Sequence, residues 1–293
     1  MNKFLQRLKS GGVLVLDGAT GTNLQQRGLE RGAAAERWVL ERPQEIVRLH
    51  RDFISAGADV ILTCTFGGTT IRLEHAGLAE QAAEVNRRAV ELAQQAAAAS
   101  GGAVLVAGSI GPTGQLLKPF GPLEEADAVA AFAVQARTLA QAGVDLLVIE
   151  TQYDLAEARA ALQGVRAACD LPLVMSFSYD RGTRTMMGVR PAQMAQELAG
   201  LVDVVGINCG RSLEDNFKAL GELRAATSLP LWFKPNAGMP ELDEAGVPSY
   251  SLTSARMGEL APEWVKAGAT LVGGCCGTSP QHLQAVADAV KGL

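Results

Sequence analysis

The stretch AGVDLLVIE at residues 142–150 joins the glycine-terminated end of a helix to an unbroken apolar run. A glycine just beyond a helix readily takes the left-handed conformation that ends it. A continuously apolar run is typical of a strand that is covered on both faces. The same order of features returns in AGADVILT (56–63) and AGATLVGG (267–274). The repeat predicts helices that each lead into a buried parallel strand.

Apolar runs of this kind occur eight times along the chain, and segments with helical spacing of apolar residues lie between them. Such alternation is typical of an α/β fold, either a closed (β/α)8 barrel or an open doubly wound sheet. The predicted strands cover residues 13–17, 59–63, 103–108, 145–150, 171–177, 202–208, 229–234 and 270–274. The predicted helices cover residues 44–57, 78–99, 124–142, 155–168, 191–199, 212–227, 254–267 and 280–290.

The turn DGATGT (17–22), directly after the first predicted strand, separates these two architectures. An open nucleotide-binding sheet carries a glycine-rich phosphate turn at this place, with the pattern G-x-G-x-x-G or G-K-[ST]. DGATGT has neither pattern. Together with the count of eight strands, this favours a single (β/α)8 TIM barrel. Because no linker or low-complexity tract interrupts the series, we expect one domain over residues 1–293.

The composition fits a large globular core and argues against several classes of partner. Of the 293 residues, 48% are hydrophobic and 19% are charged, and the formal net charge is −5. The basic residues form no block or stripe, so we expect neither a nucleic acid nor a membrane surface as a partner. The run 13–16 is too short for the core of a signal peptide, and no apolar stretch has the length of a membrane span. We therefore expect a cytoplasmic protein, in which the five cysteines are thiols or metal ligands.

Three of the five cysteines lie where a barrel of this type carries its active site, at the carboxyl ends of the strands. Cys209 follows the sixth predicted strand, and Cys275 and Cys276 follow the eighth. Only the seventh strand separates these positions in a closed barrel, so the three sulfur atoms can meet at one point. Three protein ligands with one open position are typical of a catalytic zinc ion, and thiolates favour zinc over magnesium or calcium.

A zinc ion held by three thiolates carries a net negative charge, which makes it a poor Lewis acid for the activation of water. It is a good holder of a fourth thiolate, because a thiol that coordinates the ion loses its proton at neutral pH. The thiolate is the nucleophilic form of a thiol. The site therefore suits attack by a substrate sulfur on an electrophilic carbon better than it suits hydrolysis.

Other interpretations of the cysteines stay open at this point. We expect Cys169 to be a small buried hydrophobic residue, whereas Cys64 stands at the barrel mouth, with either a packing or a ligand role. For Cys275 and Cys276 the alternatives are packing or a vicinal disulfide. The glycines that flank the pair in GGCCGT (273–278) favour a tight turn that lets both sulfur atoms face one ion.

Two acidic residues end predicted strands, Asp17 the first and Glu150 the fourth. Two carboxylates at one barrel mouth can bind an ammonium group, as an amino-acid substrate requires. A strand-end aspartate is about as often a turn or cap residue. We expect His50, His75 and His282 to be surface or packing residues.

Seven short sequence motifs, spread over nearly the whole chain from about Leu16 to His282, carry a resemblance to a known family and occur in that family's order. They are DGATGTNLQQRG (17–28), TCTFGGTT (63–70), GSIGPTG (108–114), ETQYDLAEARAAL (150–162), GINCG (206–210), KPNAGMP (234–240) and GGCCGTSP (273–280). Together they resemble the homocysteine S-methyltransferase family, and within it the homocysteine-binding domain of the cobalamin-dependent methionine synthases. GINCG combined with GGCCGT is highly specific, whereas each of the other segments alone is a weak signal.

The resemblance implies a homocysteine-binding barrel that transfers a methyl group to the thiol of homocysteine and gives methionine. It implies one zinc ion per chain as the catalytic centre, held by Cys209, Cys275 and Cys276. The substrate-binding residues that it implies are Asp17 and Glu150 at the amino-acid end of homocysteine, with Gly18, Ser109 and Asn208 in the pocket wall.

The methyl donor is the least defined part of the resemblance. The betaine-using branch has a tyrosine where this chain has Gly67, which argues against betaine, whereas GPTG (111–114) and RTMMGV (184–189) resemble the corrinoid-linked branch. Because no folate or cobalamin module precedes the end at Leu293, we expect methylcobalamin or a separate methyl-corrinoid protein as the donor. A small sulfonium such as S-methylmethionine is the alternative. The rival hypotheses are a different thiol acceptor in a demethylation pathway and a metal-free binding barrel.

Overall fold

The computed structural model describes residues 2–242 and 248–293. Its main sheet consists of eight parallel strands, which lie within about two residues of the predicted positions. The strands are β1 (Leu14–Val15), β2 (Val60–Leu62), β3 (Leu105–Ile110), β4 (Leu146–Gln152), β5 (Leu173–Phe177), β6 (Val204–Cys209), β7 (Leu231–Pro235) and β10 (Ala269–Val272).

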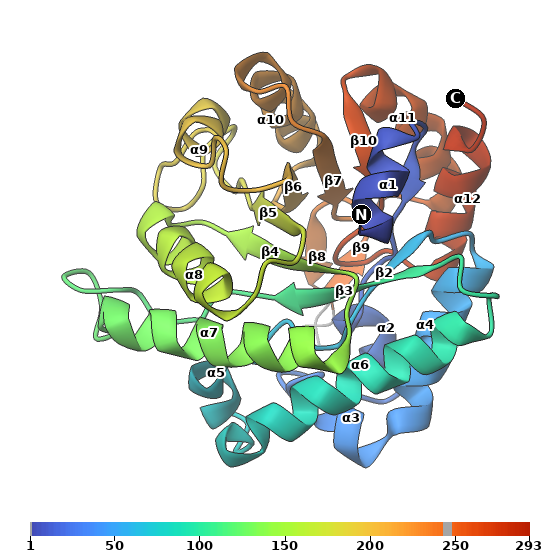
Figure 1. Cartoon of the computed structure of the whole chain (residues 1–293). Coiled ribbons are helices and arrows are strands. Elements are labelled where there is room, and N and C mark those ends of the chain that lie inside the picture. The colour runs from blue at the N-terminus through green and yellow to red at the C-terminus, as the bar shows by residue number, and fades with distance from the viewer. Residues whose placement is uncertain (1, 243–247) are drawn as a thin grey trace.

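The sheet closes on itself, which confirms the predicted (β/α)8 barrel. Its strand order is β1-β10-β7-β6-β5-β4-β3-β2, so the first and last strands of the chain are neighbours. Leu14 pairs with Leu271 on this side, and an isolated parallel bridge between Leu16 and Val60 joins β1 to β2. Figure 1 shows the strands in the middle of the molecule with helices around them.

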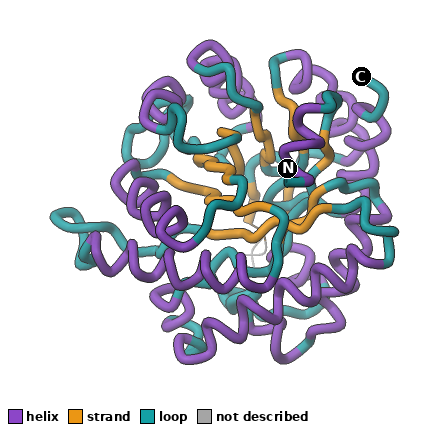
Figure 2. Tube along the Cα trace, viewed as in Figure 1, coloured by secondary structure: helices purple, strands orange, loops and turns teal. Residues whose placement is uncertain are grey.

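Each barrel strand is followed along the chain by a helix of the outer ring. Figure 2 shows the helices, in purple, around the strands, in orange. Local capping explains several of their ends: the side chain of Asp154 accepts from the amide of Ala156, and Gly143 ends its helix with φ of 91°. No helix in the described part of the chain is long and apolar enough to cross a membrane. The ring consists of α4 (Pro43–Ser55), α6 (Ala82–Ala98), α7 (Glu125–Ala142), α8 (Leu155–Ala168), α9 (Pro191–Glu197), α10 (Leu213–Ala226), α11 (Ser254–Lys266) and α12 (Pro280–Val290).

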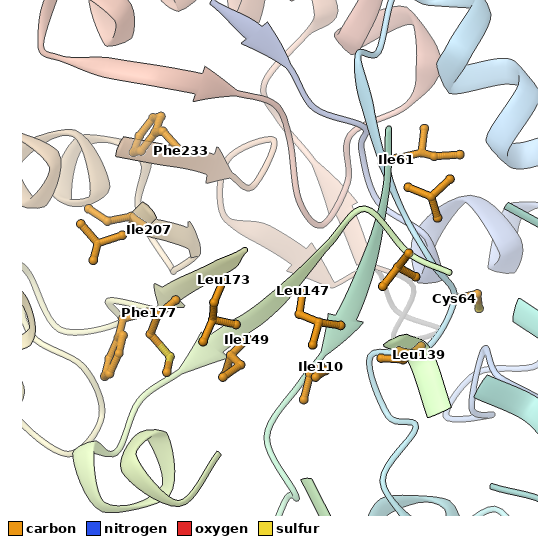
Figure 3. Packing of buried hydrophobic residues seen from close by; sticks show 14 of the residues in the cluster. Ile61, Cys64, Ile110, Leu139, Leu147, Ile149, Leu173, Phe177, Ile207 and Phe233 are labelled. Carbon is orange, nitrogen blue, oxygen red and sulfur yellow. The ribbon is translucent and has the colours of Figure 1, made fainter. Parts of the chain in front are cut away.

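The core has two layers, as the continuously apolar strands require. The layer between strands and helices includes Leu147 and Ile149 of β4 and Leu139 of α7 (Figure 3). The second layer fills the barrel itself and includes Trp232 of β7. Phe4, which is 0% exposed, belongs to this inner layer although it lies outside the barrel strands.

Several short elements were not expected from the sequence. α1 (Lys3–Lys9) carries Phe4 into the barrel interior, although its segment reads as a polar N-terminus. A two-stranded antiparallel hairpin follows β7, where no strand was predicted. These elements are too short to show a hydrophobic period. They are α1, α2 (Gly21–Gln26), α3 (Arg37–Glu41), α5 (Thr70–Glu74), the 3-10 helix η1 (Ala79–Gln81), β8 (Pro240–Leu242) and β9 (Pro248–Tyr250).

Candidate metal centre and thiol pocket

The three predicted cysteines come together at the barrel mouth. Cys209 is the last residue of β6, and Cys275 and Cys276 follow β10. The Sγ atom of Cys209 lies 2.9 Å from that of Cys275 and 3.8 Å from that of Cys276. All three sulfur atoms lie within 4.8 Å of one another, and all three residues are half-buried.

Cys209 is held in an unusual backbone conformation. Its φ of 56° lies in the left-handed region, which non-glycine residues rarely adopt. Side-chain amides fix this turn: Asn216 donates to the carbonyl of Cys209 at 2.6 Å, and Asn236 donates to the carbonyl of Gly210 at 2.7 Å. A strained backbone conformation of this kind persists only where surrounding contacts hold it in place, and such conformations cluster at functional sites.

The loop that carries Cys275 and Cys276 is packed so closely that two of its positions have space only for glycine. A Cβ on Gly274 would lie 2.5 Å from Thr278, and one on Gly277 would lie 2.2 Å from the ring of Tyr250. The hydroxyl of Thr278 donates to the carbonyl of Cys275 at 2.7 Å. The glycines therefore set the direction of both sulfur atoms, as the sequence predicts.

The sulfur cluster fits a tetrahedral zinc ion in chemistry and in size. Sulfur atoms that share one zinc ion lie roughly 3.8 Å apart. The separation of Cys209 and Cys276 has this value, and that of Cys209 and Cys275 is shorter, at 2.9 Å. Hydrogen bonds from Cys209 and then from Cys275 hold the pKa of Cys276 well below its usual value. The hydrogen bond with Cys275 is the largest cause that raises the pKa of Cys209 well above its usual value, so the cluster holds a single thiolate, whose charge a soft divalent metal would neutralise.

Glu150, at the end of β4, forms an acidic wall beside the sulfur atoms. Its Oε1 atom accepts from the hydroxyl of Ser109 at 2.6 Å, and its Oε2 atom accepts from the amide of Asn208 at 3.3 Å. Burial raises the pKa of Glu150 to about 7. Asn208 also binds the backbone of Thr151, which has a φ of 60°, and so links the end of β4 to the strand that carries Cys209.

Asp17, at the other predicted acidic position, is already paired. Its Oδ1 atom lies 2.6 Å from the Nζ atom of Lys234, and its Oδ2 atom accepts from the amide of Leu62 at 2.7 Å. Both side chains of the ion pair are almost fully buried, 2% exposed for Asp17 and 3% for Lys234. Burial lowers the pKa of Lys234, but the carboxylates of Asp17 and Glu150 outweigh this effect and raise it above its usual value.

A cavity of about 990 Å³ opens over the sulfur atoms. Three predicted substrate-binding residues, Gly18, Ser109 and Glu150, line it together with the three cysteines. Asp17 and Asn208 lie behind the wall and contact the cavity through their partners. Lys234, which does line the cavity, has no assigned role in the sequence prediction. From the cysteines the cavity extends outward to residues 28–38 and to the rim near residue 75.

The remaining residues that the sequence singles out lie away from the cluster of three sulfur atoms. His50 is buried in α4, His75 is exposed at the outer rim of the cavity, and His282 caps α12 through Ser279. This placement agrees with the prediction that the histidines are surface or packing residues. Cys64 packs in the core and also lines the cavity, outside the cluster of three sulfur atoms.

Comparisons with known proteins agree with this geometry. A family model described as homocysteine S-methyltransferase matches residues 14–290. The chain is 32% identical over 298 residues to the methionine synthase of Mycobacterium tuberculosis, in a match that covers 96% of this chain and 25% of that protein. The chain thus spans about a quarter of the length of the curated relatives it matches.

Solved structures of one relative match over the full length. The metallated form of the homocysteine methyltransferase MmuM from Escherichia coli is 29% identical, with a TM-score of 0.82, and the match covers 97% of this chain and 98% of that one. The oxidized form of the same enzyme gives a TM-score of 0.83 at the same identity, over 98% and 99%. The extent of the family match, the barrel and the three converging cysteines lead to one conclusion: the chain belongs to the homocysteine S-methyltransferase family.

Proposed function

We propose that this protein is a zinc-dependent methyltransferase that methylates the thiol of homocysteine and releases methionine. The observation that carries the proposal is the convergence of Cys209, Cys275 and Cys276 at the floor of an open cavity. The relatives, a methionine synthase and a homocysteine methyltransferase solved in a metallated form, support the acceptor and the metal.

Cys209, Cys275 and Cys276 would hold one zinc ion, which when bound would keep the substrate sulfur as a thiolate at neutral pH. The sulfur attacks the methyl carbon in line, a carbon–sulfur bond forms, and the bond from the methyl group to the donor breaks. The electron pair of that bond leaves with the donor. Alignment of the two reactants in one cavity is worth on the order of 7–11 kcal/mol when the fit is good.

The chain's own groups would orient homocysteine over the sulfur atoms. Glu150 lines the cavity and presents a carboxylate that Ser109 and Asn208 hold in place, so it can accept a hydrogen bond from the substrate ammonium group. Gly18 forms another part of the wall. The site thus matches a thiol on a short amino-acid chain.

The donor that we propose is a methyl-corrinoid, either methylcobalamin or a corrinoid carried by a separate protein. The likeness to methionine synthases supports it, and so does a cavity at the upper end of the usual range for small-molecule sites, about 300–1,000 Å³. S-methylmethionine is the second candidate, which the full-length match to a single-barrel homocysteine methyltransferase favours. A different thiol acceptor in a demethylation pathway is the third.

The test combines metal content with methyl transfer. We expect the purified protein to hold one zinc ion and to form methionine from homocysteine when methylcobalamin, S-methylmethionine, betaine and methyl-folate are offered in turn, with methylcobalamin the most active. A Cys209→Ala variant loses both zinc and transfer, because only two sulfur ligands remain. Cys169→Ala is the matched control, since Cys169 lies outside the sulfur cluster and follows α8.

A Cys209→Ala variant that keeps full zinc and full transfer would refute the assignment of the metal site. Full zinc in the wild-type protein, with no transfer from any donor to homocysteine, would refute the proposed acceptor. Protein that is free of zinc yet binds homocysteine would favour the metal-free binding barrel.

A further inference from the structure

Asp17 and Lys234 form a buried ion pair beside the cavity. The substrate therefore does not meet the two free carboxylates that the sequence predicts there. Lys234 lines the cavity, while Asp17 stands behind it. Both carboxylate oxygens of Asp17 have a donor within the protein, the Nζ atom of Lys234 at 2.6 Å and the amide of Leu62 at 2.7 Å. Lys234 is therefore the member of this ion pair that lines the cavity, and Asp17 is not.

A substrate ammonium group that bound Asp17 would have to displace Lys234 from its partner. Removal of one partner from a buried ion pair is strongly unfavourable, because it leaves an uncompensated charge in a poorly solvated place. Lys234 is 3% exposed, so its displaced ammonium group would meet little water here. The ammonium group of Lys234 thus occupies the place beside Asp17 where two free carboxylates at the barrel mouth would bind a substrate ammonium group.

The ammonium group of Lys234 can bind an anionic group of a substrate. Lys234 has three hydrogen-bond donors, of which the contact with Asp17 uses one. The second acidic residue of the wall, Glu150, is bonded firmly through Oε1 to Ser109 and more loosely, at 3.3 Å, through Oε2 to Asn208. Homocysteine thus fits with its carboxylate at Lys234 and its ammonium group at Glu150.

We propose that Lys234 is a specificity-determining residue that selects acceptor thiols by a carboxylate head group, so that the carboxylate matters more for binding than the amine. This inference rests on the proposed function, and it names the chemical class of the acceptor: an aliphatic thiol that carries a carboxylate. An amine is an accessory group that Glu150 accommodates.

Three thiols that differ by one group test the proposal. Homocysteine carries both groups, 4-mercaptobutanoate lacks the amine, and 3-aminopropane-1-thiol lacks the carboxylate. Their dissociation constants are measured by titration calorimetry on the zinc-loaded protein with no methyl donor present. Because hydrogen bonds to charged groups are strong, we expect loss of the carboxylate to weaken binding about tenfold or more. Loss of the amine is expected to weaken binding less.

Variants separate Lys234 from the rest of the pocket. In Lys234→Met the preference for 4-mercaptobutanoate over 3-aminopropane-1-thiol should fall about tenfold or reverse, because the cationic group is gone and Asp17 becomes free. Since this change leaves a buried carboxylate without its partner, the double variant Asp17→Asn/Lys234→Met, which removes both charges, is measured beside it. Lys218→Met is the matched control, because Lys218 is exposed on α10.

The outcomes separate this inference from the proposed function. If no thiol binds the zinc-loaded wild type, the proposed function itself fails. If homocysteine and 3-aminopropane-1-thiol bind equally while 4-mercaptobutanoate binds poorly, the proposed function stands and the role of Lys234 is overturned. An unchanged preference in both Lys234 variants also overturns it.

Discussion

At the scale of single residues, the site depends on side-chain amides that hold strand ends in place. Among the described residues, Thr151 and Cys209 are the non-glycine positions with positive φ, at 60° and 56°. Asn208 lies next to Cys209 and hydrogen-bonds both the amide and the hydroxyl of Thr151. Loss of the Asn208 side chain would therefore release Glu150 and Thr151 at the end of β4.

The sulfur atoms could be located from the sequence, but their charged neighbours could not. The strand–helix alternation fixes which residues reach the barrel mouth, so Cys209, Cys275 and Cys276 follow from the strand count. The pairing of Lys234 with Asp17 spans 217 positions, and it depends on side-chain length and direction inside the barrel. Strand periodicity carries no information on either quantity.

His50 gives a prediction on stability against pH. It is 2% exposed, and burial lowers its pKa to about 4, whereas a histidine in an unfolded chain titrates near 6.5. As the pH falls below 6.5 the unfolded chain takes up the proton first, so folded-state stability is lost between pH 6.5 and about 4. Between pH 7.5 and 5.0 the loss from this residue is about 2 kcal/mol.

We expect a His50→Leu variant to lack this part of the acid sensitivity when the free energy of unfolding is measured at both pH values. The difference between wild type and variant isolates His50 from the buried carboxyl groups, which also titrate. A His75→Leu variant, altered at an exposed position, should follow the wild type. Parallel curves for wild type and His50→Leu would contradict the prediction.

At the scale of elements, the long helices and the buried strands follow from the sequence, whereas the short elements do not. The predicted helix at residues 155–168 has the same bounds in the structure, where Asp154 caps it. α1 was missed because its seven residues are too few to show a hydrophobic period, although Phe4, Leu5 and Leu8 all pack on the inner core. Its position depends on contacts with distant loops: Arg7 donates to Asp59 at 2.8 Å and to the carbonyl of Ala103.

Phe4 makes α1 a closing element of the barrel, and this gives a prediction at the same scale. The ring packs with Trp232 and the other side chains that fill the barrel. Truncation of a fully buried phenylalanine usually costs about 3–5 kcal/mol. We expect Phe4→Ala to lose this amount in denaturant unfolding, with little change in zinc content, because the sulfur atoms lie at the carboxyl ends of the strands.

Lys3→Ala, an exposed change in the same helix, should stay within about 0.5 kcal/mol of the wild type. If Phe4→Ala were as stable as Lys3→Ala, the inner core would not need α1.

At the scale of the whole molecule, the proposed metal would couple the site to the stability of the fold. Cys209 and the pair of Cys275 and Cys276 stand on two strands that are separated only by β7. A ligand that binds the folded chain alone stabilises it by about 4 kcal/mol at a thousandfold excess over its dissociation constant. For a chain of this size that corresponds to a rise in Tm of roughly 7 °C.

The expectation of one domain over residues 1–293 stays a prediction.

The measurement is calorimetric unfolding of the protein with zinc and after dialysis against a chelator. We expect Tm to fall by that order when zinc is removed and to recover when it is returned. The Cys209→Ala variant should show no difference between the two conditions. An identical Tm for the zinc-loaded and the chelated wild type would exclude tight binding to the folded state.

The pairing of β1 with β10 has a consequence for biosynthesis. The seam of the barrel joins Leu14 to Leu271, a residue that is synthesised much later than Leu14. Cys275 and Cys276 follow directly after that final strand. A nascent or truncated chain that stops before β10 therefore has an open seam and a single ligating sulfur. A newly made chain can therefore assemble the three-sulfur cluster only after β10 and the loop that follows it have been synthesised.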